Sequence, residues 1–414
     1  MPIKGVINLP GDKSISHRAL MVASLTSGKT YINNLSTGMD VESTKLCLRT
    51  CGIQISKIKS TTVVASEKFK SPGIPLDCGN SGTTARLLTG LLVGRKLNAQ
   101  LIGDKSLSKR PMNRIIEPLN KMGACIQSNN GHLPLIISSS NTDAIDYTMP
   151  VASAQVKSSI IFASLGSDRQ TVIREKIKTR DHTEIMLKYL GVGISNGKSI
   201  RIDPIKNELT PFEITIPGDP SSAAFYAAAA AMIPNSDLTI KNLLANPTRI
   251  CFFSILEKMG TKISWSNMRN EMGELVGDVH IYSQPLNGLN ISDETIPLII
   301  DEIPIIAILA TQADSPTIIK GAQELRVKES DRINSICHNL KKMGADIIET
   351  NDGFIINPEN KLRHAKIITF GDHRIAMAFT IAGLMTNKQN SLDDVNCVDI
   401  SFPEFFDILR KISK

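Results

Sequence analysis

The chain has 414 residues and a formal net charge of +7, and 42% of its residues are apolar, 21% charged and 4% aromatic. The length indicates two domains of about 200 residues each. The low aromatic content argues against a nucleic-acid-binding protein, because few side chains could stack on bases. Seven scattered cysteines without a Cys-x-x-Cys pair argue against a disulfide framework or a structural zinc site, and favour reduced thiols in the cytoplasm. No apolar run reaches the ~20 residues of a membrane-spanning helix.

The first predicted element is a strand over residues 1–11, which follows the initial Met directly, so we expect no signal or transit peptide. A Pro-Gly-Asp turn then starts a helix that carries Lys13, Ser14 and Arg18. A helix N terminus offers free N–H groups and a partial positive charge, and arginine can bind phosphate through two N–H groups. This segment predicts an anion site, with an ordinary capped helix bearing solvated charges as the alternative.

Two later loops have a similar character. Residues 78–88 place Asn80 and Gly82 in a Gly-Asn-Ser-Gly turn before an apolar helix, which lets the backbone approach a ligand closely. In residues 103–112, Pro111 suits the first turn of a helix and thereby places Arg110 at the helix mouth. The alternative for residues 78–88 is a tight turn with a helix cap, and the alternative for residues 103–112 is a solvated basic loop.

Further along, residues 153–159 are polar just before an apolar helix, and residues 179–184 are dense in hydrogen-bond donors. Asp301 and Glu302 lie between apolar runs, and buried carboxylates near cations are candidates for acid–base chemistry, although many are paired helix caps. In residues 325–333 two cations bracket an acid that could exchange protons, with a surface salt-bridge face as the alternative.

Residues 371–378 form another loop-to-helix start, Gly-Asp-His-Arg. No dinucleotide-binding glycine motif, His-Glu-x-x-His motif or His/Cys cluster occurs, so we expect neither a metal nor a cofactor. Transfer of a phosphate-rich group without a metal would need several Arg and Lys residues, which these loops supply.

A recurring helix ending, Leu-x-x-Φ-Gly-x-x-Ile, divides the chain into similar pieces. Its glycines are 71, 68, 69 and 84 residues apart, at Gly52, Gly123, Gly191, Gly260 and Gly344. A glycine just past a helix takes the left-handed conformation that closes it, and the alternation that follows starts a strand. The period allows six units, the last ending near residues 405–412.

A longer repeat relates the two halves of the chain. Residues 9–24 resemble residues 216–231, with Asp12 and Asp219 at equivalent positions 207 residues apart. We therefore expect one three-unit domain over residues 12–218 and a second over 219–414, completed by strand 1–11. Joints near residues 10–12 and 217–219 would act as hinges that let the halves close on a ligand.

Taken in order, these motifs resemble the 5-enolpyruvylshikimate-3-phosphate synthase (3-phosphoshikimate 1-carboxyvinyltransferase) family from Pro10 to Phe405. The resemblance implies an α/β fold of two similar domains, each of three βαβαββ-type units with helices packed inside sheets, an inside-out α/β barrel. Residues 153–157 (Ser-Ala-Gln-Val-Lys) and 180–184 (Arg-Asp-His-Thr-Glu) look like the branch that includes glyphosate-tolerant bacterial enzymes.

The resemblance also implies the reaction. The enolpyruvyl group of phosphoenolpyruvate would pass to the 5-hydroxyl of shikimate 3-phosphate, with release of phosphate. Asp301 is implied as the base for the hydroxyl proton, and Glu329 and Lys13 are alternatives for the proton at C3. A cytoplasmic monomer is expected, without cofactor, nucleic acid or membrane, and with glyphosate as a candidate inhibitor.

The implied binding residues come from every loop described above. Those implied for shikimate 3-phosphate are Lys13, Ser14, Arg18, Ser153, Ala154, Gln155, Arg180, Asp301 and Lys328. Those implied for phosphoenolpyruvate are Lys13, Asn80, Gly82, Arg110, Gln155, Glu329, Arg332, His373 and Arg374.

Some positions depart from the family pattern. Ile400 stands where many family members have a lysine near the C terminus. Ala154 stands where one branch of the family has a serine, and Glu324 where that branch has an asparagine. Gly82 lacks the methyl group of the alanine that some tolerant relatives have there. Two rival functions remain. The transferase acting on UDP-N-acetylglucosamine has a reactive cysteine where this chain has Lys105, and a non-enzymatic anion-binding repeat protein would not explain the ordered acids at Asp301 and Glu329.

Overall fold

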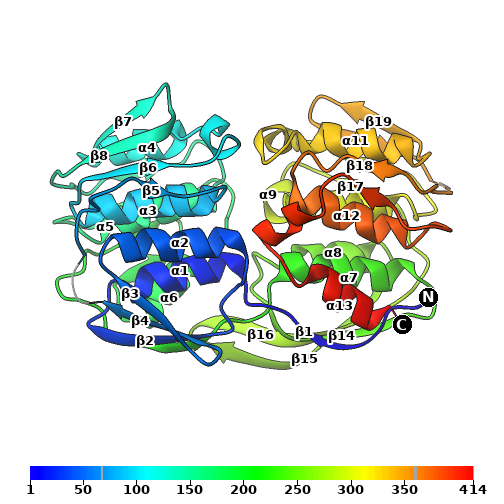
Figure 1. The fold of residues 1–414 in the computed structure, drawn as a ribbon, viewed down its shortest axis with the longest axis horizontal. Helices are drawn as coiled ribbons and strands as arrows, with labels where there is room; N and C mark the ends of the chain where they lie inside the picture. Colours follow the sequence, from blue (N-terminus) through cyan, green and yellow to red (C-terminus); the bar gives the residue numbers. More distant parts are fainter. Residues whose placement is uncertain (67–68, 359–360, 414) are drawn as a thin grey trace. The chain divides into compact units, whose positions relative to one another are not determined.

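The computed structural model describes residues 1–66, 69–358 and 361–413. The chain divides into two compact units, one coloured mostly from blue to green and the other mostly from green to red, with the blue N-terminal segment, in Figure 1. The first unit comprises Gly11–Ile216 with Glu271–Glu274, and the second comprises Met1–Pro10, Pro217–Asn270 and Leu275–Lys414. The sequence-based limits placed all of residues 219–414 in one domain, whereas the structure groups residues 271–274 with the first unit.

The first unit alternates helices with short strands. In chain order its elements are α1 (Lys13–Ala23), β2 (Gly28–Asn33), α2 (Met39–Thr50), β3 (Gln54–Ile58), β4 (Thr61–Ser66), β5 (Leu76–Asp77), α3 (Gly82–Gly94), β6 (Ala99–Ile102), η1 (Leu107–Lys109), α4 (Asn113–Lys121), β7 (Cys125–Asn129), β8 (His132–Ser138), β9 (Asp146–Thr148), α5 (Ala154–Ser164), β10 (Thr171–Arg174), α6 (His182–Tyr189), β11 (Ile194–Asn196), β12 (Ile200–Ile202) and β13 (Glu213–Thr215).

The second unit has the same alternation, and two of its strands have one end residue, Glu271 or Glu274, within the first unit. Its elements are β1 (Lys4–Asn8), α7 (Pro220–Met232), β14 (Asp237–Leu244), α8 (Cys251–Lys258), β15 (Lys262–Glu271), β16 (Glu274–Tyr282), β17 (Asn290–Ile291), α9 (Ile296–Ile299), α10 (Ile303–Ala310), β18 (Thr317–Ile319), η2 (Gln323–Val327), α11 (Arg332–Lys342), β19 (Ile347–Thr350), β20 (Gly353–Ile356), β21 (Lys366–Ile367), α12 (His373–Gly383), β22 (Ser391–Leu392), η3 (Asn396–Ile400) and α13 (Phe405–Ile412).

The sheets repeat one topology. The first unit has sheets in the orders β13-β2-β4-β3, β5-β6-β8-β7 and β9-β10-β12-β11, and the second has β1-β14-β16-β15 and β17-β18-β20-β19. Parallel pairing joins the first two strands in each, as in β1 with β14 and β13 with β2. A sixth sheet in the described part of the chain has only β21 and β22. The predicted α/β repeat is thus confirmed, with its last sheet reduced to two strands.

Helices fill the interior of each unit, and the small sheets lie outside them (Figure 1). In α7 the alanine run 227–231 is fully buried, because only small side chains allow helices to pack closely on all sides. The α3–α5 contact uses glycine in the same way, since a Cβ at Gly90 would lie 2.0 Å from the Ser159 carbonyl oxygen. Among the described residues, no helix combines the length and apolar character needed to cross a membrane.

Local sequence signals set the helix boundaries. The five repeat glycines all have positive φ, between 85° and 103°, as the helix-ending motif predicts. Asp12 accepts a hydrogen bond from the Ile15 amide at 2.7 Å, and Asp219 accepts one from the Ser221 amide at 2.8 Å. The two equivalent aspartates therefore cap α1 and α7.

Candidate active site

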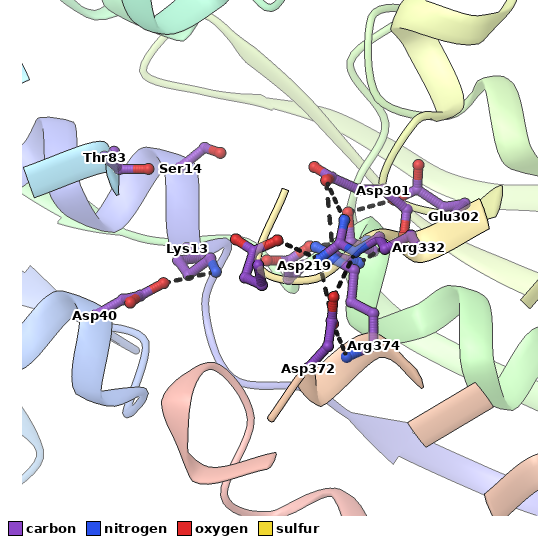
Figure 2. Close-up of polar contacts among 12 residues, drawn as sticks. Lys13, Ser14, Asp40, Thr83, Asp219, Asp301, Glu302, Arg332, Asp372 and Arg374 are labelled. Atoms are coloured by element: carbon purple, nitrogen blue, oxygen red, sulfur yellow. Dashed lines mark hydrogen bonds and ion pairs between the residues drawn. The ribbon is translucent and has the colours of Figure 1, made fainter. Parts of the chain in front are cut away.

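In the first unit, the N terminus of α1 presents a cation that already has a partner. Lys13 Nζ lies 2.8 Å from Asp40 Oδ2 of α2, and both side chains are partly exposed, at 21% and 11% (Figure 2). Ser14 lies in the same turn and accepts a long contact, 3.4 Å, from Arg180 Nη1. Lys13, Ser14 and Arg180 therefore share one locality, and Asp40 is an acidic partner that the sequence analysis did not identify.

Arg18 is more deeply placed than an open anion site requires. It is 2% exposed, and it donates to Thr183 Oγ1 and Ser158 Oγ at 2.7 Å and to the Ser14 carbonyl oxygen at 2.8 Å. These bonds join α1 to α5 and α6 and fix the first turn of α1. Direct binding of substrate by Arg18 stays a prediction.

The second and third predicted loops meet at Arg110. Its Nη2 donates to Asn80 Oδ1 at 2.7 Å and its Nη1 to the Asn80 carbonyl oxygen at 3.3 Å. Gly82 begins α3 beside them, since a Cβ built there would lie 3.5 Å from Arg110 Nη1. One expectation was wrong: α4 begins at Asn113 with Met112 as its N-cap, so Pro111 precedes the helix, and Arg110 instead ends η1.

Gln155 is held by groups on α3. Arg86 Nη1 donates to Gln155 Oε1 at 2.8 Å, and Gln155 Nε2 donates to Thr83 Oγ1 at 2.9 Å. Ser153 caps α5 and Ala154 is its first residue, with its methyl in place of a hydroxyl. Arg86 was missed by the sequence analysis, although a single arginine inside the apolar helix Gly82–Gly94 was a signal that could have identified it.

A buried ion pair joins α5 to α6. The polar segment 153–159, expected just before an apolar helix, instead forms the N-cap and first turns of α5. Lys157 Nζ lies 2.8 Å from Glu184 Oε1, and both side chains are at most 1% exposed. Burial raises the pKa of the Glu184 carboxyl, and the Lys157 charge opposes that shift. Next to them His182 Nδ1 lies 2.6 Å from Glu274 Oε1, which secures residues 271–274 within the first unit.

In the second unit, two arginines lie beside Asp301. Arg332 Nη1 is 3.5 Å and Arg374 Nε is 3.8 Å from Asp301 Oδ1, and Arg374 Nη1 donates to the Asp301 carbonyl oxygen at 3.0 Å (Figure 2). Asp301 remains 18% exposed, whereas Arg332 is 1% exposed and its Nη1 has no hydrogen-bond partner among the described residues. A buried cationic donor without a hydrogen bond therefore lies next to an accessible carboxylate.

The same guanidinium is surrounded by acids. Arg332 Nη2 donates to Glu329 Oε2 at 2.6 Å and Nε to Asp372 Oδ2 at 2.8 Å. Burial opposes the charge of Arg332, but Asp372 and Glu329 outweigh it and raise the pKa of Arg332 above its ordinary value. For Asp372, burial would raise the pKa, but the charges of Arg332 and His373 and the hydrogen bond from Arg332 together lower it below its ordinary value. Arg332 and Asp372 therefore stay charged near neutral pH.

Lys328 and His373 complete the predicted set in this unit. Burial lowers the pKa of the Lys328 ammonium, and Asp301 opposes that shift. His373 is the first residue of α12, whose N-cap Asp372 accepts from the Arg374 amide at 2.9 Å. For Arg326 the surface salt-bridge alternative holds, because it pairs with Asp331 at 2.8 Å and Glu349 at 3.1 Å.

The arrangement can bind small anions and exchange protons. Each unit places guanidinium or ammonium groups at the starts of helices, and the second adds a carboxylate beside two of them. No group of three or more His, Cys, Asp or Glu side chains suited to a metal ion occurs in the described ranges.

Comparison with known proteins identifies the family. The family model for EPSP synthase (3-phosphoshikimate 1-carboxyvinyltransferase) matches residues 1–409. The chain belongs to the EPSP synthase family. A 3-phosphoshikimate 1-carboxyvinyltransferase from Oceanobacillus iheyensis is 44% identical over 418 residues, covering 100% of this chain and 97% of that relative. The Thermodesulfovibrio yellowstonii relative of the same name is 44% identical over 420 residues, covering 100% and 98%.

Solved structures agree with this EPSP synthase assignment. EPSP synthase from Acinetobacter baumannii superposes with a TM-score of 0.88 at 38% identity, over 99% of this chain and 96% of that one. The enolpyruvyl transferase NikO from Streptomyces tendae has a TM-score of 0.77 at 14% identity, over 100% and 95%, and shares the fold. The fold class predicted from the repeats is therefore confirmed.

One buried residue of this EPSP synthase family member predicts a pH effect on stability. His17 is fully buried, and burial, followed by the charges of Lys13 and Arg18, holds its pKa well below its ordinary 6.5. As pH falls below about 6.5 the unfolded chain binds a proton that the folded chain does not, so stability falls by up to about 1.4 kcal/mol per pH unit.

We therefore expect His17→Asn to lose less stability than the wild type between about pH 7.5 and pH 5.5. Urea unfolding at both pH values measures the difference. His364→Asn, at an exposed position, is the control and should keep the wild-type acid loss. Equal acid losses in wild type and His17→Asn would contradict the neutral state of buried His17.

Proposed function

We propose that this chain transfers the enolpyruvyl group of phosphoenolpyruvate to the 5-hydroxyl of shikimate 3-phosphate and releases phosphate, in aromatic amino acid biosynthesis. The observation that carries the proposal is the buried Arg332 Nη1, without a hydrogen bond and 3.5 Å from Asp301 Oδ1. An anionic substrate would satisfy this donor, and a carboxylate beside it could take a proton from a hydroxyl.

The reaction moves protons at two places, the 5-hydroxyl group of shikimate 3-phosphate and carbon C3 of phosphoenolpyruvate. The 5-hydroxyl oxygen attacks C2 of the enol, its proton goes to Asp301, and C3 gains a proton, which gives a tetrahedral ketal phosphate. Phosphate then leaves with the C2–O bonding pair, and C3 returns a proton to restore the double bond. Glu329 and Lys13 remain the two candidates for the proton at C3. Arg332 and Arg374 would offset charge on the carboxylate and the leaving phosphate.

The binding assignments follow the family pattern and the contacts within each unit. For shikimate 3-phosphate we propose the phosphate-binding set Lys13, Ser14 and Arg180, supported by the proximity of Arg180 Nη1 to Ser14 Oγ. Arg18, Ser153, Ala154, Gln155, Asp301 and Lys328 would complete its binding. Arg180 and Ser14 supply the N–H and O–H donors that a phosphate prefers.

For phosphoenolpyruvate the proposed ligands are cationic or lie beside a cation. In the first unit they are Lys13, Asn80, Gly82, Arg110 and Gln155. In the second unit they are Glu329, Arg332, His373 and Arg374. The Arg110–Asn80 and Arg86–Gln155 hydrogen bonds support the first group, because they fix the orientation of both side chains before substrate arrives.

A phosphate-release assay separates the proposal from its rivals. Wild-type protein is incubated with phosphoenolpyruvate alone, with added shikimate 3-phosphate, or with added UDP-N-acetylglucosamine. Release only with shikimate 3-phosphate is expected. Release with UDP-N-acetylglucosamine would assign the related transferase, and no release with either acceptor would favour the non-enzymatic anion-binding alternative.

The response to glyphosate is the next assignment to measure. We propose glyphosate as an inhibitor that competes with phosphoenolpyruvate. The Ser-Ala-Gln-Val-Lys and Arg-Asp-His-Thr-Glu segments favour the tolerant branch, whereas the absent methyl at Gly82 favours binding. Because the two features point in opposite directions, the inhibition constant in the same assay assigns the branch.

We propose further that the protein acts as a monomer in the cytoplasm. Its unpaired cysteines are in keeping with the reducing conditions of that compartment.

Gly82→Ala should weaken the phosphoenolpyruvate site. The new Cβ would lie 2.7 Å from Arg86 Nη1, so the guanidinium that holds Gln155 must move. We expect KM for phosphoenolpyruvate to rise roughly 10- to 100-fold, since a displacement of about 1 Å can have this effect. Gly73→Ala, where a Cβ meets nothing within 4 Å, should leave KM unchanged. An unchanged KM in Gly82→Ala would contradict the placement of this loop in the site.

A further inference from the structure

A chain of buried hydrogen bonds joins three helices of the first unit behind the proposed substrate groups. His17 Nδ1 of α1 lies 2.7 Å from Thr44 Oγ1 of α2, and Thr44 Oγ1 lies 2.7 Å from Thr84 Oγ1 of α3. Thr84 Oγ1 donates to Ser81 Oγ, the N-cap of α3, at 2.7 Å. All four side chains are at most 1% exposed, so water does not compete for these bonds.

The chain runs one helical turn behind the Lys13–Asp40 ion pair. His17 follows Lys13 by four residues in α1, and Thr44 follows Asp40 by four residues in α2, so each pair lies on one face of its helix. Two successive turns of α1 are therefore bonded to two successive turns of α2. Two such links fix the rotation of each helix as well as its distance from the other.

The far end of the chain reaches the loop that begins α3. Ser81 also accepts from the Thr84 amide at 3.1 Å, and Gly82 follows it directly. Gly82 lies beside Arg110 and Arg86, as the contacts of a Cβ built on it indicate. The position of the Gly82 backbone relative to Lys13 is thus linked, through Thr44, to the rotation of α2.

The direction of the bonds assigns the histidine tautomer. If His17 Nδ1–H donates to Thr44, then Thr44 donates to Thr84. The Thr84 hydroxyl then donates to Ser81 Oγ at 2.7 Å and has the Asp40 carbonyl oxygen as a second, longer acceptor at 3.2 Å. His17 Nε2 has no hydrogen-bond partner in the described part of the chain, and as a bare lone pair it leaves no N–H unsatisfied. The neutral Nδ1–H form is the one that completes the chain.

We propose that the His17–Thr44–Thr84–Ser81 chain is a positioning device, which holds the N termini of α1 and α3 in register so that Lys13 and the Gly82 loop bind their anions together. The inference rests on the proposed function. His17 and Thr44 are positioning residues: they act through Lys13 and Gly82 and exchange no proton with the substrates.

Thr44→Val tests the device, because valine keeps the shape and removes the hydroxyl at the centre of the chain. We expect KM for both substrates to rise about tenfold or more, since a misplaced binding group raises KM. Thr44→Ser restores the hydroxyl and should return KM to within about threefold of wild type. Thr89→Val is the matched control: Thr89 is a buried threonine of α3 whose hydroxyl donates to the Ala85 carbonyl oxygen one turn earlier, at 2.7 Å.

The KM values separate positioning from general stability. A purely structural role would lower the amount of folded enzyme, and with it the apparent kcat, while KM stayed the same. If Thr44→Val raises KM no more than Thr89→Val does, the proposal is overturned. If Thr44→Val does not fold, Thr84→Val takes its place, because it breaks the chain at the next hydroxyl. Its KM values are compared with those of Thr89→Val in the same way.

A pH profile separates positioning from proton transfer. His17→Asn keeps an amide that can donate to Thr44 and cannot titrate, so the pH–rate profile should keep its shape. Loss of one limb of the profile would show that His17 exchanges protons and would overturn its assignment. A wild type without transferase activity would refute the proposed function, whereas an active wild type with an unaffected Thr44→Val refutes this inference alone.

Discussion

We expect Asp301→Asn to lower kcat by about a thousandfold and to leave the affinity for shikimate 3-phosphate close to that of the wild type. Asparagine keeps the shape of the side chain and can still contact Arg332 and Arg374, but it cannot take a proton from the 5-hydroxyl. General-base catalysis contributes about 10²- to 10⁴-fold, which sets the size of the effect. Phosphate release gives kcat, and calorimetric titration with shikimate 3-phosphate gives the affinity.

The control for this substitution is Asp314→Asn, because Asp314 is exposed and its carboxylate accepts a hydrogen bond from its neighbour, Ser315 Oγ, at 2.8 Å. It should have wild-type kcat and affinity. Full turnover in Asp301→Asn would remove this residue from the mechanism. Loss of shikimate 3-phosphate binding together with turnover would assign it to binding instead.

Arg332→Ala should destabilise the second unit as well as abolish turnover. The substitution leaves Asp372, which is fully buried, and the neighbouring Glu329 without their cation. Removing one partner of a buried ion pair typically costs about 3–5 kcal/mol, because the remaining charge is buried without compensation. Urea unfolding measures the loss. Arg410→Ala removes a cation that is 77% exposed, paired with Asp407, and should change stability by at most about 1 kcal/mol.

The pH dependence of this loss checks its cause. In the wild type, Arg332 holds the pKa of Asp372 below its ordinary value, so the ion pair contributes stability at pH values above the unfolded pKa of about 4. That contribution disappears as pH falls through the folded pKa. The stability difference between wild type and Arg332→Ala should therefore narrow in acid. A difference that stays constant with pH would indicate lost packing around the arginine as the cause.

Much of the fold could be predicted because its signals are local. Gly52 and the four equivalent glycines end their helices because they adopt a positive φ. Asp12 and Asp219 each cap a helix by accepting from a backbone amide two or three residues further along the chain. Strand pairing was harder to predict. Glu213 of β13 pairs with Tyr31 of β2, and no local pattern names a partner so far along the chain. Residues 271–274 belong to the first unit, where Glu274 contacts His182, and this contact also joins residues that lie far apart in the sequence.

The candidate site could be predicted residue by residue but not as a network. Helix starts and basic or glycine-rich loops identified Lys13 and Arg110, and Asp301 was identified as an acid between apolar runs. The partner of Lys13 could not be chosen from sequence, because Asp40 and Glu42 are both acids in the first turn of α2 and only packing selects Asp40. Arg86 escaped notice because its role is to hold Gln155, which a helix elsewhere in the chain supplies.

Isotope transfer tests the central claim, that the enzyme attacks carbon C2 of phosphoenolpyruvate and not phosphorus. Phosphoenolpyruvate is labelled with 18O at the oxygen that bridges C2 and phosphorus, and turned over with shikimate 3-phosphate by the wild-type protein. Mass spectrometry of the products should find the label in the released phosphate and none in the organic product, because the C2–O bond breaks. Label retained on the three-carbon fragment would mean that the P–O bond had broken, and would contradict enolpyruvyl transfer.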